Sequence, residues 1–316
     1  MYRTVVVPLD GSELAERALP YAVRLADVGA GQVILVRVAL APPPARIVGV
    51  DWEQQQIDAI KEAETYLADV AAKLGTRVAV KTNAPYGHAV REILDTVEAV
   101  GADAVVMATH GRTGLAHLVY GSVAEAVLAE SPVPVFLVHA MPGEAPAPPF
   151  NPSSARALVP LDGLAFAEAA LHTAANLVGP AGELVLACVV EPPDHVARDQ
   201  NGRVLAYLDQ QEEAVTREAR DYLAQVATGL AQSYPWLRVS TTVRIGEAAS
   251  GIVTAAVDRD ADVVVMASHG RTGVLRAVIG SVAGAVLRKG STPVLLVGPH
   301  ESHQPIETLV AQGSRT

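Results

Sequence analysis

Short apolar runs alternate along the chain with longer segments whose hydrophobic residues recur every three or four positions. In the first half the apolar runs, typical of parallel strands buried on both faces, lie at 3–9, 32–39, 77–82, 103–107 and 134–138. The longer segments predict helices at 51–74, 88–100, 122–130, 204–231, 247–259 and 281–289. Strands that alternate with helices favour the α/β class, with a doubly wound, mostly parallel, five-stranded sheet and helices on both faces.

The segment between the first two apolar runs predicts a further helix that begins after Ser12. Serine is a favoured N-cap residue because its hydroxyl can accept a hydrogen bond from the first helical turn. Pro20 lies inside this segment and is expected to kink or locally distort the helix. Since His172 takes its place in the second half of the chain, we expect the fold not to depend on the proline.

The chain repeats itself. Residues 102–128 align without a gap on 261–287, with 19 of 27 positions identical, and the Pro-Leu-Asp-Gly of 8–11 returns at 160–163. A repeat this long indicates two similar domains, each of the doubly wound class. We expect the chain to divide into a first domain, a Pro-rich linker, a second domain and a flexible tail, at 1–140, 141–153, 154–299 and 300–316.

Composition narrows the function classes. The chain has 316 residues, of which 50% are hydrophobic, and a formal net charge of −10, which disfavours binding to nucleic-acid backbones. Its single cysteine, Cys188, can form neither an internal disulfide nor a paired-cysteine zinc site. The N-terminus shows no leader pattern, and no run approaches 18 apolar residues. We expect a cytoplasmic protein with neither a membrane nor a nucleic-acid partner.

The candidate chemistry follows the first and fourth strands of each half. In sheets of this class ligands bind at the carboxyl ends of the strands. Strand one ends in Asp10-Gly11-Ser12, and a glycine-rich loop after strand four runs to Gly121-Ser122 at the start of a helix. We expect Ser122 to cap this helix, whose free N–H groups suit a phosphate, and Gly121 to take positive φ or to let the backbone approach an anion.

Arg112 in the same loop can add a charge-assisted hydrogen bond to a phosphate. A carboxylate such as Asp10 would repel phosphates and fits the hydroxyl or amino groups of a nucleoside better. The simpler alternative is that the glycines only form a tight turn, that Ser122 only caps its helix, and that Asp10 only caps the first helix.

Several enzyme classes are disfavoured. The chain has no Gly-x-x-x-x-Gly-Lys-Ser/Thr phosphate loop, and Gly280-Ser281 does not match a hydrolase nucleophile elbow. His110 and His269 have no second imidazole or carboxylate at metal-ligand spacing. We therefore expect no catalytic residue and no metal site.

Both halves resemble the universal stress protein family, whose ATP-binding members share Gly, two residues, Gly, nine residues, then Gly-Ser or Gly-Thr. In the first half the pattern runs from Ala108 through Gly111 to Gly121-Ser122. The second half repeats it, beginning at Ala267, so alanine replaces the opening glycine in both copies. The resemblance implies that Asp10 lies near adenosine, that Val38 on strand two lines the adenine pocket, and that the glycine loop holds ribose and phosphates.

Taken together, the residues expected to bind ATP, with or without Mg²⁺, come from both halves. The first-half set is Pro8, Asp10, Gly11, Ser12, Val38, Met107, Ala108, His110, Gly111, Arg112, Gly114, Gly121, Ser122 and Val123. The second-half set is Pro160, Asp162, Gly163, Val189, Met266, Ala267, His269, Gly270, Arg271, Gly273, Gly280, Ser281 and Val282. Leu164 stands where the first half has Ser12, so the first site matches the pattern better.

The leading hypothesis is a tandem universal stress protein that binds ATP or a related adenine nucleotide and acts as a nucleotide-responsive stress or regulatory protein instead of an enzyme. The alternative is an interaction or scaffold module whose crevices no longer bind nucleotide, which alanine at 108 and 267 and Leu164 favour. The apolar runs 133–138 and 294–297 predict edge strands, and the resemblance implies that the two halves pair through them. Two chains can also associate as a homodimer.

Overall fold

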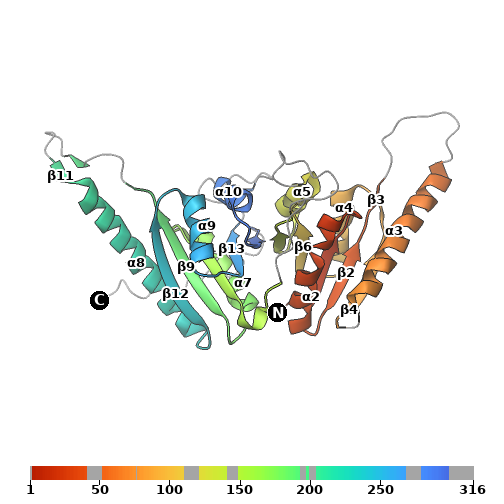
Figure 1. The fold of residues 1–316 in the computed structure, drawn as a ribbon, viewed down its shortest axis with the longest axis horizontal. Coiled ribbons are helices and arrows are strands. Elements are labelled where there is room, and N and C mark those ends of the chain that lie inside the picture. The colour runs from red at the N-terminus through yellow and green to blue at the C-terminus, as the bar shows by residue number, and fades with distance from the viewer. Residues whose placement is uncertain are drawn as a thin grey trace. The chain divides into compact units, whose positions relative to one another are not determined.

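The computed structural model describes residues 2–40, 52–75, 77–109, 121–140, 149–192, 197–198, 204–267 and 279–298. Within these residues, those up to Pro152 form one compact unit, and those from Ser153 to Ala267 together with those from Gly280 onward form a second. Each unit is an α/β sandwich, coloured from red to yellow-green for the first and from green to blue for the second (Figure 1). The predicted fold class is confirmed.

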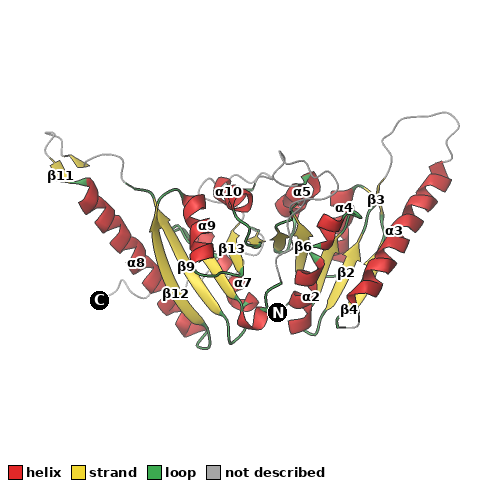
Figure 2. Ribbon diagram, in the orientation of Figure 1, coloured by secondary structure: helices red, strands yellow, loops and turns green. Residues whose placement is uncertain are grey.

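The first unit is built on a five-stranded parallel sheet. Its strands are β1 (Thr4–Pro8), β2 (Gln32–Val36), β4 (Ala79–Asn83), β6 (Ala104–Ala108) and β7 (Val135–Val138). Within the unit they lie in the order β7-β6-β1-β2-β4. The helices are α1 (Glu13–Glu16), α2 (Leu19–Val28), α3 (Trp52–Leu74), α4 (Ala89–Ala99) and α5 (Ser122–Glu130). Because parallel crossovers are right-handed, this order puts α1 to α3 on one face and α4 with α5, which pack together, on the other (Figure 2).

The second unit repeats this architecture. Its strands are β8 (Arg156–Pro160), β9 (Glu183–Val190), β12 (Arg238–Ile245), β13 (Val263–Ala267) and β14 (Val294–Val297), in the order β12-β9-β8-β13-β14. Its helices are α6 (Ala165–Glu168), α7 (Ala170–Leu177), α8 (Leu208–Ser233), α9 (Ala248–Asp258) and α10 (Ser281–Lys289). A single 3₁₀ turn, η1 (Pro152–Ser154), precedes β8.

Two short ladders lie outside these sheets. β3 (Ala39–Leu40) pairs in parallel with β5 (Tyr86–Gly87), and β10 (Ala197–Arg198) pairs antiparallel with β11 (Val204–Ala206). The expected helix start at residue 204 is therefore wrong, since β11 takes up 204–206 and α8 begins at Leu208. An apolar run as short as Val-Leu-Ala fits a helix and a strand equally well by pattern alone.

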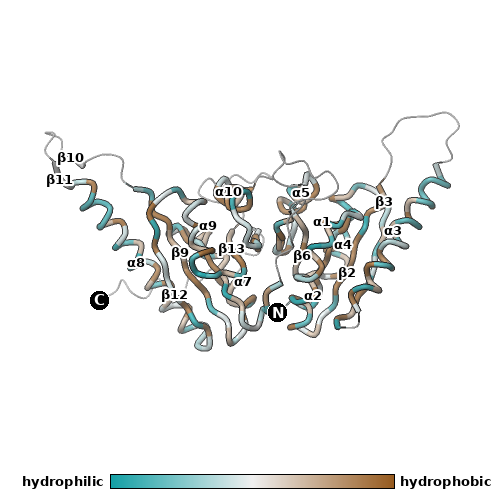
Figure 3. The backbone as a smooth tube through the Cα atoms, in the orientation of Figure 1, coloured by the Kyte–Doolittle hydropathy of each residue, from teal (hydrophilic) through white to brown (hydrophobic). Residues whose placement is uncertain are grey.

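Burial follows the place of each strand in its sheet. Every residue of β1 and β6 is buried, as expected for central strands covered on both faces. The expectation of burial on both faces is wrong for 77–82, because β4 is the outermost strand and four of its five residues are exposed. The hydropathy colouring shows the same contrast between the apolar central strands and helix α3, which carries both polar and apolar residues (Figure 3).

The expected single helix after strand one is split into α1 and α2. Pro20 stands in the first turn of α2, where its missing N–H costs no hydrogen bond, so it helps to begin a helix instead of kinking one. The second unit has the same break at Ala169, between α6 and α7, without any proline. The break therefore belongs to the fold, in line with the expectation that the fold does not depend on the proline.

An aromatic cluster closes the core of the first unit. The ring of Phe136 on β7 lies 5.7 Å from that of Tyr21 on α2 and 5.9 Å from that of Phe150. Phe136 is fully buried, and Phe150 is buried although it falls in the segment expected to be a linker. Aromatic pairs at these separations contribute beyond their buried area.

Candidate functional site

The sheet order creates a topological switch point in each unit. From β1 the chain proceeds outward to β2 and β4 on one side, and then returns to β6 and β7 on the other. In such sheets ligands bind outside the carboxyl ends of the two strands that flank the switch, here β1 and β6, or β8 and β13. The residues that follow these four strands therefore form the candidate sites.

The turn after β1 is fixed by hydrogen bonds of Asp10. The Oδ1 atom of this half-buried side chain accepts from the Ser12 backbone N–H at 3.0 Å and from the Ser12 hydroxyl at 2.6 Å. The Ser12 oxygen in turn accepts from the backbone N–H of Ala15 at 3.1 Å, so Ser12 is the N-cap of α1 as predicted. Gly11 between them has φ of +88°, which glycine adopts without strain. Asp10 thus orients the cap and does not itself cap the helix.

The turn after β8 keeps only part of this arrangement. Asp162 Oδ1 accepts from the backbone N–H of Leu164 at 3.1 Å, and Gly163 has φ of +81°. Leu164 is the N-cap residue of α6 but has no side-chain oxygen to accept a bond from the helix. Asp162 and Leu164 are both exposed, so the second turn has the same backbone with one polar group fewer.

The start of α5 lies at the end of β6. The backbone N–H of Gly121 donates to the carbonyl oxygen of Thr109 at 2.9 Å, and Thr109 N–H donates to Val138 at 2.9 Å. Gly121 is the N-cap residue, and Ser122 is the first residue of the helix, followed by Val123. The expectation that Ser122 caps the helix is therefore wrong. In the second unit, too, Gly280 is the N-cap residue of α10, Ser281 is its first residue, and Val282 follows.

The expectation of positive φ is also wrong for Gly121 and Gly280, whose φ values are −62° and −52°. The glycine serves a different purpose at this position. Glycine has no side chain that could accept from the first-turn N–H groups, and no described side chain caps either helix, so the described residues leave these donors and the positive end of the helix dipole without a side-chain partner. Each unit therefore carries a helix N-terminus suited to an anion beside its switch point.

Two predicted residues on each fourth strand are part of the strand itself. Met107 and Ala108 are buried residues of β6, and Ala108 is in register with Val138 of β7. Met266 and Ala267 occupy the same place on β13. The opening alanine of the pattern therefore lies in regular extended backbone that places no demand for glycine. Pro8 and Pro160 end β1 and β8.

The two predicted adenine-pocket valines differ in their surroundings. Val189 lies on β9, close enough to α9 that a Cβ added at Gly251 would be 2.6 Å from one of its methyl carbons. Val38 is not on strand two as expected, because β2 ends at Val36. The chain leaves the sheet there, as Ala39 N–H donates to the carbonyl of Pro85 in the small β3–β5 ladder.

The remaining predicted residues follow β6 and β13 in the sequence and lie outside the described residues. They are His110, Gly111, Arg112, Gly114, His269, Gly270, Arg271 and Gly273.

A polar cluster that the sequence did not predict lies beside Gly11. Arg37, the residue after β2, forms a 2.7 Å ion pair with Glu62 of α3, and its guanidinium lies 4.7 Å from the ring centre of Tyr66. The Tyr66 hydroxyl donates to Glu16 of α1 at 3.0 Å. Burial and this bond to a carboxylate raise the pKa of Tyr66.

The second unit keeps one half of this cluster. Tyr222 donates to Glu168 at 2.8 Å, as Tyr66 donates to Glu16, and burial followed by that bond raises the pKa of Tyr222. The recurrence of a Glu–Tyr pair in both halves was the signal in the sequence that could have revealed the cluster.

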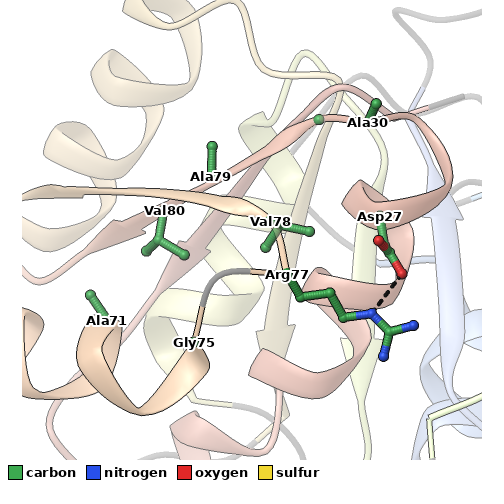
Figure 4. A pocket seen from close by; sticks show the side chains of 9 residues that line it. Asp27, Ala30, Ala71, Gly75, Arg77, Val78, Ala79 and Val80 are labelled. Carbon is green, nitrogen blue, oxygen red and sulfur yellow. Dashed lines mark hydrogen bonds and ion pairs between the residues drawn. The ribbon is translucent and has the colours of Figure 1, made fainter.

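A separate cavity of about 700 Å³ lies at the opposite, amino end of the first sheet (Figure 4). It is bounded by the end of α2, the end of α3 and the start of β4, and an ion pair of 2.8 Å joins Arg77 to Asp27 at its rim. It contains none of the predicted binding residues. In the part of the chain that the structure covers, no cluster of three His, Cys, Asp or Glu side chains could hold a metal ion. No described helix has the length and apolarity needed to cross a bilayer.

Comparison with known proteins agrees with the geometry. The family model described as "Universal stress protein family" matches residues 1–139 and again residues 154–298. The chain is 28% identical over 298 residues to the Mycobacterium tuberculosis universal stress protein Rv2005c, covering 92% of this chain and 96% of the relative. It is 32% identical over 140 residues, or 44% of its length, to the Synechocystis universal stress protein Sll1654.

A crystal structure of an Archaeoglobus fulgidus universal stress protein superposes with a TM-score of 0.63 at 22% identity and covers 93% of this chain and 96% of that one, which shows the shared fold. The two family matches fall on the two units that repeat the same sheet order. The chain belongs to the universal stress protein family and carries two of its domains in tandem.

Proposed function

We propose that this protein binds ATP or a related adenine nucleotide at the switch points of its two domains and acts as a nucleotide-responsive stress or regulatory protein. The observation that carries the proposal is the hydrogen bond from Gly121 N–H to Thr109. It holds an N-terminus without a side-chain cap at the carboxyl end of β6, the strand next to β1. A phosphate chain fits those donors.

The turn after β1 supplies the complementary half of the site. Asp10 is an acceptor held in place by Ser12, and it suits a ribose hydroxyl or an amino group better than a phosphate. With phosphates at α5 and the nucleoside at Asp10, the like charges stay apart. Asp162 and the start of α10 offer the same pair of features in the second domain.

We assign no catalytic residue. Asp10, the carboxylate in the turn after β1, is engaged by Ser12, an arrangement that suits positioning a ligand better than activating a water molecule. Mg²⁺ would accompany the phosphates as their counterion. A turnover number well below about 1 per second is expected, under the usual range of enzymes.

The test is to denature freshly purified protein and identify any released nucleotide by mass spectrometry, with its molar ratio to protein. Thermal melting with ATP complements it, because ligand at about 100 times its dissociation constant adds roughly 2.7 kcal/mol. Gly121→Val and Gly280→Val, which place a side chain at each helix start, should each remove the nucleotide that its own domain holds. If nothing is released and melting is insensitive to ATP, the interaction-module alternative replaces this proposal.

The assembly and location belong to the same proposal. β7 and β14 are the outermost strands on one side of their own sheets, and unpaired apolar edges favour association. We propose that the two domains pair through these edges and that two chains form a homodimer. We also propose that the protein is located in the cytoplasm. Analytical ultracentrifugation and cross-linking between β7 and β14 cysteine variants would test it.

A further inference from the structure

The glycine that follows β1 lies against a guanidinium group. A Cβ built on Gly11 would be 3.3 Å from both the Cζ and an Nη atom of Arg37. Arg37 is held there by Glu62 at 2.7 Å and by the face of Tyr66. Its side chain is only 14% exposed, which is low for an arginine. The space above Gly11 in the first domain is therefore filled by a paired cation.

None of the described residues fills the same space in the second domain. Gly163 has nearly the same backbone conformation as Gly11, but a Cβ built on it meets no described atom within 4 Å. Strand register explains the difference. Pro8 pairs with Val36 and Pro160 with Ala187, so the next residue along β2 is Arg37 and the next along β9 is Cys188.

Cys188 adds no charge at this place. Burial, and then the nearby Asp162 carboxylate, raise the pKa of the thiol, which keeps it neutral. The flanking pair of Tyr222 and Glu168 matches Tyr66 and Glu16, so the surroundings of the two glycines differ in Arg37 against Cys188 and in Ser12 against Leu164.

We propose that Arg37 makes the two nucleotide sites unequal, so that the second domain binds ATP tightly and the first binds it weakly. This inference rests on the proposed function, which puts the nucleoside beside Asp10 and Asp162. A guanidinium has only donors, and so does the exocyclic amino group of adenine, so no hydrogen bond can form between the two where they meet. ATP at the first site must also move Arg37 from Glu62, whereas no described residue fills this space at the second site.

The experiment is isothermal titration of the full chain with ATP, using residue exchange between the domains. The wild type should show one tight site and a second site at least tenfold weaker. Arg37→Cys, which copies the second domain, should give two tight sites. Cys188→Arg, which copies the first, should leave none. Arg77→Cys makes the same chemical change at an ion pair on the far edge of the sheet and should behave as wild type.

The outcomes separate this inference from the proposed function. Two equal sites in the wild type, or one tight site that persists alone in Arg37→Cys, would overturn the inequality and leave nucleotide binding standing. Loss of the tight site in Gly121→Val but not in Gly280→Val would also overturn it. A flat titration for the wild type and for Arg37→Cys would overturn both proposals. If Cys188→Arg fails to fold, Arg37→Cys alone decides.

Discussion

The hydroxyl of Ser12 donates to Oδ1 of Asp10 at 2.6 Å while its oxygen accepts from the backbone N–H of Ala15 at 3.1 Å. One side chain thus stabilises the start of α1 and fixes the carboxylate that we assign to the nucleoside. The stability of the first domain and the orientation of its site are therefore coupled through Ser12.

Replacing Ser12 with alanine removes both bonds. We expect Ser12→Ala to lower the free energy of unfolding of the first domain by about 0.5–2 kcal/mol, the usual effect of losing an N-cap side chain. Urea denaturation measures it. Leu164→Ala is the matched control, because Leu164 holds the same position on α6 without a side-chain cap bond and should cost clearly less. Equal losses in the two variants would contradict the role of Ser12.

Gly31 is constrained by close approach and not by its φ. A Cβ there would lie 2.8 Å from the carbonyl carbon of Arg3 and closer still to its oxygen, which accepts from Gln32 at 2.7 Å beside the β1–β2 ladder. We expect Gly31→Ala to cost on the order of 1–3 kcal/mol, as overpacking does, measured by urea denaturation.

The control for Gly31 is a glycine with room around it. A Cβ on Gly121 meets no atom of the described residues within 4 Å, and its φ of −62° suits any residue. Gly121→Ala should therefore cost no more than about 1 kcal/mol, the penalty for alanine at an N-cap. A larger loss for Gly121→Ala than for Gly31→Ala would refute the steric argument.

Periodicity alone could predict the sheet and most helices, because burial on both faces of a central strand and on one face of a helix leaves a regular pattern. The helix ranges 88–100, 122–130, 247–259 and 281–289 each agree with the structure to within a residue at either end. The periodicity failed to predict the structure where position in the tertiary fold determines burial or secondary structure. β4 is exposed because it is the outermost strand, and residues 204–206, expected to begin a helix, form β11 instead.

The site was predictable in outline and not in detail. The turn at Asp10 depends only on neighbouring residues, so it could be predicted from the sequence. Whether Gly121 or Ser122 caps α5 depends on a single pair of backbone angles, which residue preferences do not resolve. The contact of Arg37 with Gly11 and Glu62 joins three elements distant in sequence and could be found only from the structure.

Glu247 makes the stability of α9 depend on pH. Its carboxylate accepts from Ala249 and Ser250 N–H groups and from Lys289 at 2.7 Å, and mainly the lysine bond lowers its pKa to about 2. A carboxyl group whose pKa is lower in the folded state stabilises the fold above its ordinary pKa near 4.5, and this contribution is lost as the pH falls toward 2.

We expect the difference in melting temperature between wild type and Glu247→Gln to be greatest near neutral pH and to vanish by about pH 2. Because the pair is exposed, added salt should shrink the difference as well. Lys289→Met should reduce the same pH dependence, since it removes the main cause of the lowered pKa. A difference that stays constant from pH 7 to pH 2 would show that the carboxylate charge contributes nothing.

The aromatic cluster around Phe136 should be the most sensitive point of the first domain's core. Phe136 is fully buried on β7 and contacts Tyr21 and Phe150, whose rings lie 6.3 Å apart. Phe136→Ala leaves a cavity between a strand, a helix and the segment after β7, and we expect a loss of about 3–5 kcal/mol in the free energy of unfolding. Phe136→Leu retains most of the volume and should cost much less, and urea denaturation of both variants measures the difference. If Phe150→Ala is as costly as Phe136→Ala, the segment before β8 belongs to the first domain's core as much as β7 does. If Phe136→Ala costs under about 1 kcal/mol, the cluster is not part of that core.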